Sequence, residues 1–173
     1  PLFVWLLITD DGQNVSLRWW ATAFFVVAIA TDALDGWIAR RYNLVTSLGK
    51  LLDPLADKVL TGAALIGLSI IAELPWWVTI VVLAREIGVT VHRLFEARSV
   101  VVAAAWMGKV KTVAQAVAIT LALTPLVSLV GEGMVWVNTV TMTVAVILTI
   151  ASGIDYVVTA FRMSRAREEH SSG

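Results

Sequence analysis

Four aspartates gather around one short polar turn between two long apolar segments of the sequence. Asp32 and Asp35 lie at the end of the first segment, and Asp53 and Asp57 lie at the start of the second. Spacings of three and four residues place each pair on one face of a helix. Because the link near residues 42–47 is short, the two helices are predicted to be antiparallel neighbours, with both pairs at a similar depth.

The aspartates have the chemistry of a metal site. Four carboxylates this close repel one another unless some are protonated or a cation neutralises them. Hard divalent cations prefer oxygen ligands, and no His or Cys lies near the turn. The set suits two Mg²⁺ or Mn²⁺ ions about 3.5–4 Å apart, the arrangement that serves phosphoryl displacement. The plainer alternative is a group of aspartates solvated at helix ends, which four residues in register disfavour.

Small and basic residues lie among the aspartates. Gly36, Ala39 and Gly49 leave room for a flat ligand beside the metals, although small residues also serve close helix packing in membranes. Arg40 is placed to face a phosphate from the end of its helix, or it marks membrane topology. Lys58 is placed to pair with a carboxylate. The turn therefore combines metal ligands with space and charge for a phosphorylated ligand.

The composition defines the class of protein that must position these residues. Of the 173 residues, 58% are hydrophobic and 15% are charged, against about 25% charged in a soluble globular protein. This excludes a soluble enzyme and a disordered chain. The 13 Lys and Arg are balanced by 13 Asp and Glu, so nucleic acid is not expected as a partner, and the absence of Cys excludes thiolate zinc sites. An integral membrane protein remains.

Apolar runs predict an all-α polytopic membrane helix bundle that forms a single domain over residues 1–173. Full spans are expected at about 19–40, 48–72, 75–95, 108–130 and 134–161. Each is long enough for a hydrocarbon core that takes about 20 helical residues, and helices satisfy the backbone in lipid. Residues 1–8 are too short to span and are interpreted as the end of a truncated first helix, so six transmembrane helices are predicted for the full protein.

Basic residues predict the orientation of the bundle. The loops at 9–17, 72–76 and 130–134 hold no Lys or Arg, and Arg18 alone lies near that side. The opposite helix ends carry Arg40, Arg41, Lys50, Arg93, Arg98, Lys109, Lys111, Arg162, Arg165 and Arg167. The positive-inside bias places these ends, and the aspartates with them, on the cytoplasmic side.

Residues 32–57 follow the pattern Asp-x2-Asp-Gly-x2-Ala-Arg-x8-Gly-x3-Asp-x3-Asp. This pattern resembles the signature of the CDP-alcohol phosphatidyltransferase family. Stretches at 76–79, 84–87 and 108–115 are similar to its bacterial phosphatidylglycerophosphate synthase branch. The resemblance covers nearly the whole chain and departs at the N-terminus, where the family usually begins with an amphipathic segment and a full first helix.

The resemblance implies a reaction and roles for the signature residues. CDP-diacylglycerol would give its phosphatidyl group to sn-glycerol 3-phosphate and release CMP. Asp32, Asp35 and Asp53 would be chiefly metal ligands, and Asp57 would be a ligand and the general base. Asp32, Gly36, Ala39, Arg40, Gly49 and Asp53 would bind CDP. The resemblance also implies a homodimer among the lipids of a bacterial inner (plasma) membrane, multi-pass, with its active site facing the cytoplasm.

A phosphorylated acceptor needs cations of its own. Arg85 lies inside a predicted span beside Glu86, Arg93 follows about two turns later near the same face, and Lys109 and Lys111 begin the next span. The four basic residues are predicted to form a pocket for the acceptor phosphate. Two alternatives remain: Arg85 and Glu86 as an intramembrane ion pair, and the two lysines as topology determinants.

Rival functions use the same acidic turn. Inositol phosphate, serine or phosphatidylglycerol as acceptor would fit the same signature, and the predicted phosphate pocket argues only against serine. A divalent-cation transporter with four carboxylates as its filter is a remote alternative, disfavoured because the carboxylates cluster towards one side. Asp155, in the last predicted span, has no assigned role.

Overall fold

The computed structural model describes residues 2–42, 47–95 and 105–171. Within these ranges, side chains are described except at residues 10, 40, 47–55, 92–95, 105–107, 160–161 and 163–171. Every regular element in these ranges is helical, as predicted. The elements are α1 (Leu2–Ile8), a 3-10 turn (Thr9–Gly12), α2 (Val15–Arg41), α3 (Ser47–Ile70), α4 (Trp76–Phe95), α5 (Ala105–Leu123), α6 (Val127–Val130) and α7 (Gly133–Ser171).

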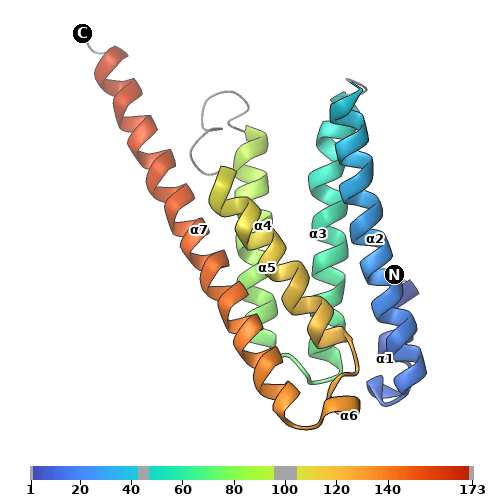
Figure 1. Ribbon diagram of the computed structural model, residues 1–173. Helices are drawn as coiled ribbons and strands as arrows, with labels where there is room; N and C mark the ends of the chain where they lie inside the picture. The colour runs from blue at the N-terminus through green and yellow to red at the C-terminus, as the bar shows by residue number, and fades with distance from the viewer. Residues whose placement is uncertain (1, 43–46, 96–104, 172–173) are drawn as a thin grey trace.

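The long helices run up and down in alternation (Figure 1). The end of α2, the start of α3, the end of α4, the start of α5 and the end of α7 all point toward the top of Figure 1, here called the basic end. The α3–α4 connection and α6 lie at the opposite end. Helices α2 and α3 pack against each other, which confirms the predicted antiparallel pair.

The exterior is that of a membrane protein. Within the described residues, Val15–Ala39 and Gly133–Thr159 are long and apolar enough to cross a membrane. Large apolar side chains such as Val27, Ile80 and Ile147 are well exposed on three different helices. Water would disfavour so much exposed apolar surface, whereas lipid tails accept it.

The N-terminal helix α1 is tied to the core by aromatic and small-residue contacts. The rings of Phe3 and Phe25 lie 5.5 Å apart between centroids, and Leu7 is fully buried. A Cβ at Gly67 of α3 would lie 3.0 Å from Leu7 Cδ2, so the glycine permits this close approach. Residues 1–8 were expected only as the end of a first helix; of these, the described residues 2–8 pack against α2 and α3.

One predicted boundary is wrong. The expected span at 108–130 ends at Leu123, and α6 is a separate single turn before the chain reverses at Gly131, whose φ is 93°. Pro125 lacks the backbone N–H that a continuous helix would use there. The last span, predicted at about 134–161, agrees with the apolar stretch Gly133–Thr159, and its helix continues beyond the span to Ser171.

Candidate active site

The end of α2 carries the first half of the signature. Asp32 and Asp35 are exposed one turn apart, and Gly36 and Ala39 are half-buried. Asn14 caps the start of this helix, because its side-chain Oδ1 accepts a hydrogen bond of 3.1 Å from the Leu17 N–H. From there α2 runs unbroken to Arg41. One continuous helix therefore sets the register of these residues.

Helix α3 carries the second half. Its Asp57 is half-buried, and Asp53 and Gly49 occupy helical positions one and two turns earlier. The structure does not describe the side chain of Asp53 or those of the residues next to Gly49. The side chain of Arg40 is likewise not described. Among described side chains, no group of three acidic, His or Cys residues is placed to hold a metal. The structure thus brings the two helices together, and the ligand roles stay predictions.

A cluster of opposite charges lies in the interior, centred on Glu86 of α4. Its Oε1 accepts a hydrogen bond of 3.0 Å from Arg85 Nη1 and another from Lys111 Nζ of α5. Its Oε2 lies 3.6 Å from Lys58 Nζ of α3. Arg85 Nη2 also donates to Ser152 Oγ of α7 at 3.0 Å. We call these five residues the Glu86 cluster; they connect α3, α4, α5 and α7.

The Glu86 cluster is well shielded from solvent. Glu86 and Lys111 are only 6% and 4% exposed. Ionisable groups in a membrane interior are costly unless they are paired, which explains why all three cations converge on the carboxylate. Beside them, Gln115 Nε2 donates to Thr149 Oγ1 at 2.9 Å and extends the polar contact between α5 and α7.

The packing of Arg85 depends on a glycine of α7. A Cβ at Gly153 would lie 3.2 Å from Arg85 Cγ, so the arginine stem lies directly over this position. Arg85 Nε is buried without a hydrogen-bond partner in the described part of the chain. Among the described residues, the hydrogen bonds that orient the guanidinium are those of its two Nη atoms.

Two of the four residues predicted to bind the acceptor phosphate lie together in the structure, and the phosphate-binding role of all four stays a prediction. Arg85 and Lys111 come together around Glu86, Lys109 is exposed outside the cluster, and the Arg93 side chain lies outside the described ones. The carboxylate partner expected for Lys58 is Glu86. Sequence reasoning missed Glu86 as the common partner of three cations; its only signal was an acidic residue deep in an apolar span.

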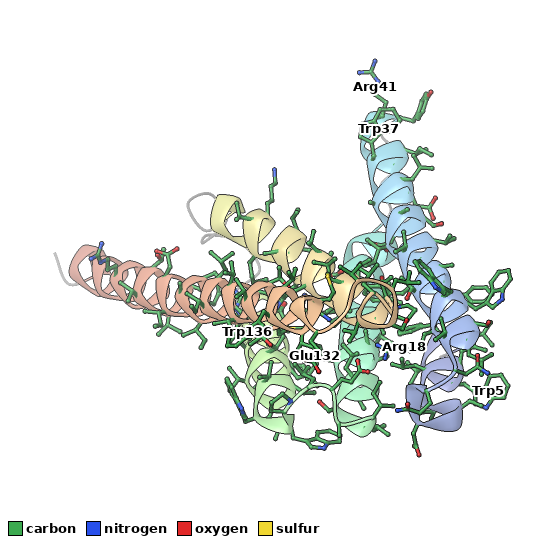
Figure 2. The ribbon with its side chains drawn as sticks, turned by 60° about the horizontal axis from the view of Figure 1, so that its bottom comes forward. Trp5, Arg18, Trp37, Arg41, Glu132 and Trp136 are labelled. Carbon is green, nitrogen blue, oxygen red and sulfur yellow. The ribbon has the colours of Figure 1, made fainter. Side chains whose placement is uncertain are left out.

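The opposite end of the bundle carries a different charge pair. Arg18 donates to both Glu73 carboxylate oxygens, and to the carbonyls of Ala122 at 2.8 Å and Leu123 at 3.3 Å. A pocket of about 880 Å³, lined mostly by apolar side chains, adjoins this pair. Figure 2 shows Arg18 far along α2 from Arg41, so this pocket lies away from the signature.

Comparison with known proteins assigns the family. The profile of the CDP-alcohol phosphatidyltransferases matches residues 1–168. The chain belongs to the CDP-alcohol phosphatidyltransferase family. This confirms the resemblance carried by residues 32–57. It also confirms the prediction that the chain is a CDP-dependent phosphatidyltransferase.

Individual phosphatidyltransferases of this family are similar over much of the chain. A Mycobacterium tuberculosis (strain H37Rv) protein named probable phosphatidylglycerophosphate synthase is 46% identical over 162 residues, 94% of this chain and 76% of its own. The CDP-diacylglycerol–glycerol-3-phosphate 3-phosphatidyltransferase of Bacillus subtilis (strain 168) is 44% identical over 120 residues, 68% of this chain and 62% of its own. A CMP-forming cardiolipin synthase of Streptomyces coelicolor is 42% identical over 86 residues, 50% of this chain and 40% of its own.

Proposed function

We propose that this phosphatidyltransferase transfers the phosphatidyl group of CDP-diacylglycerol to sn-glycerol 3-phosphate, forming phosphatidylglycerophosphate and CMP. The observation that carries the proposal is the 46% identity to a probable phosphatidylglycerophosphate synthase over 94% of the chain. The complete signature at 32–57 supports the use of a CDP-linked lipid donor. Basic helix ends beside the signature support a site that faces the cytoplasm.

Asp32, Asp35 and Asp53, with Asp57, are proposed to hold two Mg²⁺ or Mn²⁺ ions. The residues fit such ions because the donor set is entirely carboxylate and lies on two helices in contact. When bound, the ions would offset the negative charge of the pyrophosphate oxygens. Gly36, Ala39, Arg40 and Gly49, with Asp32 and Asp53, would bind CDP.

Asp57 is proposed as the general base. Asp57 is half-buried and follows Asp53 by one turn of α3. It would accept the proton of the acceptor hydroxyl as that oxygen bonds to the phosphorus that bears diacylglycerol. The bond from this phosphorus to the CMP oxygen breaks, and CMP leaves.

Arg85 and Lys111 are proposed to bind the acceptor phosphate, with Lys109 and Arg93 at the basic end. Three cations and one carboxylate in the Glu86 cluster leave two positive charges, the number that a phosphomonoester dianion neutralises. This surplus favours a phosphorylated acceptor over an uncharged one. A homodimer stays a prediction.

The test is transfer from CDP-diacylglycerol in detergent micelles to radiolabelled glycerol 3-phosphate with Mg²⁺. Labelled lipid with equimolar CMP is the expected result, and Asp57→Asn is the inactive control. Parallel reactions with inositol phosphate and phosphatidylglycerol measure the rival acceptors. Transfer to either of these but not to glycerol 3-phosphate would reject the proposed acceptor, and no transfer to any would reject the function.

A further inference from the structure

We propose that Glu86 is a positioning residue of the acceptor site, an inference that rests on the proposed function. Its carboxylate contacts Arg85, Lys111 and Lys58, and it belongs to none of the residue sets assigned above to metal, CDP or phosphate. Because a carboxylate repels a phosphate, Glu86 acts through the cations and not on the acceptor itself. It fixes where their charges lie before the acceptor arrives.

The charge balance of the Glu86 cluster separates this role from that of a simple ion pair. A purely structural pair in lipid would match one carboxylate with one cation and end neutral. Here one carboxylate faces three cations, whose side chains are between 5% and 20% exposed. Such a surplus of shielded positive charge is complementary to a phosphomonoester dianion.

Fixing the cations in advance strengthens phosphate binding. Lys and Arg side chains have many rotamers, and ordering them during binding would lower affinity. Glu86 orders Lys111 and Arg85 through one oxygen, Oε1, and Ser152 Oγ holds the other end of the guanidinium. The two cations are therefore already ordered side by side before the acceptor binds.

The same carboxylate relates the cations to the proposed base. Lys58, 3.6 Å from Glu86 Oε2, is the residue after Asp57 in α3. Helices α4 and α5, which carry Arg85 and Lys111, are thus tied to the helix that carries the base. An acceptor bound through its phosphate needs its hydroxyl at a defined distance from that base, and small displacements lower the rate strongly.

The test compares Glu86→Gln with Glu73→Gln, a matched control. Glu73 is also a carboxylate bound by an arginine, but it lies in the α3–α4 connection at the opposite end of the bundle. For Glu86→Gln we expect the KM for glycerol 3-phosphate to rise about tenfold or more, with the KM for CDP-diacylglycerol within about twofold. Glu86→Asp should recover part of the loss, and Glu73→Gln should leave both KM values unchanged.

A second variant keeps the test decisive if Glu86→Gln does not fold. Gly153→Ala retains every charge but places a Cβ 3.2 Å from Arg85 Cγ, so the arginine stem must move by a few tenths of an ångström. It should raise the KM for glycerol 3-phosphate by about threefold and leave the donor KM unchanged. Equal changes in both KM values, or a loss of thermal stability alone, would assign the Glu86 cluster a merely structural role.

Different results would reject the positioning role of Glu86 and the choice of glycerol 3-phosphate as the acceptor. If the wild type transfers to inositol phosphate instead, and Glu86→Gln selectively raises that KM, the positioning role stands while glycerol 3-phosphate is rejected. If the wild type transfers only to an acceptor without a phosphomonoester, the positioning role is rejected while phosphatidyl transfer stands. If the wild type is active and Glu86→Gln leaves both KM values unchanged, only the positioning role is rejected.

Discussion

Arg18→Ala is expected to destabilise the bundle by about 3 kcal/mol, mainly through helix capping and only in part through the ion pair with Glu73. The 2.8 Å bond to the Ala122 carbonyl is a charged hydrogen bond to a helix C-terminus and contributes about 1.5–2 kcal/mol. The 3.3 Å bond to Leu123 is longer and adds about 0.5 kcal/mol. Glu73 is 40% exposed, so water replaces most of the hydrogen bonding that its carboxylate loses in Arg18→Ala. The ion pair therefore adds at most about 1 kcal/mol.

Thermal unfolding in detergent, followed by tryptophan fluorescence, measures this effect. For a chain of this size about 3 kcal/mol lowers the Tm by roughly 6–12 °C. Glu73→Gln keeps the acceptor oxygen and the two carbonyl contacts of Arg18, so its Tm should fall by less than about 3 °C. Equal losses in the two variants would refute the reasoning, because they would show that the ion pair outweighs the capping of α5.

Three further predictions concern the proposed active site. Asp57→Asn should abolish turnover and leave CDP-diacylglycerol binding largely intact, measured by binding of the labelled donor; loss of binding as well would make Asp57 a full metal ligand. Lys111→Ala should raise the KM for glycerol 3-phosphate at least about tenfold and the donor KM far less, whereas an equal rise would place Lys111 outside the acceptor site. Chelation with EDTA should abolish transfer and added Mn²⁺ should restore it; activity that survives exhaustive chelation would refute the carboxylate metal site.

The arrangement of α2 and α3 was predictable because local features determine it. The spacing of Asp32 and Asp35 places them on one face of a helix. A short link between two apolar helices favours antiparallel packing of one against the other. The break after Leu123 was not found because the apolar run continues on both sides of Pro125. Helix α7 continues past its predicted span because residues 162–171, although polar and without a membrane signal, remain helical.

The Glu86 cluster lay beyond sequence reasoning for a different reason. Which side chains meet across a bundle depends on the rotation of each helix about its axis, and composition does not set that rotation. Lys58, Glu86 and Lys111 come from three helices, so no spacing along the chain links them. Only Arg85, adjacent to Glu86, was associated with it in advance.

Dependence of several cations on one acid also constrains how this region can change through evolution. A neutral residue at position 86 would leave Lys58, Arg85 and Lys111 facing one another in a medium that screens charge weakly. Relatives that lack the acid should therefore also lack at least one of these cations. Substitutions at the four positions are expected to be inherited together, and an alignment of homologues would reveal them as correlated columns drawn from three separate helices.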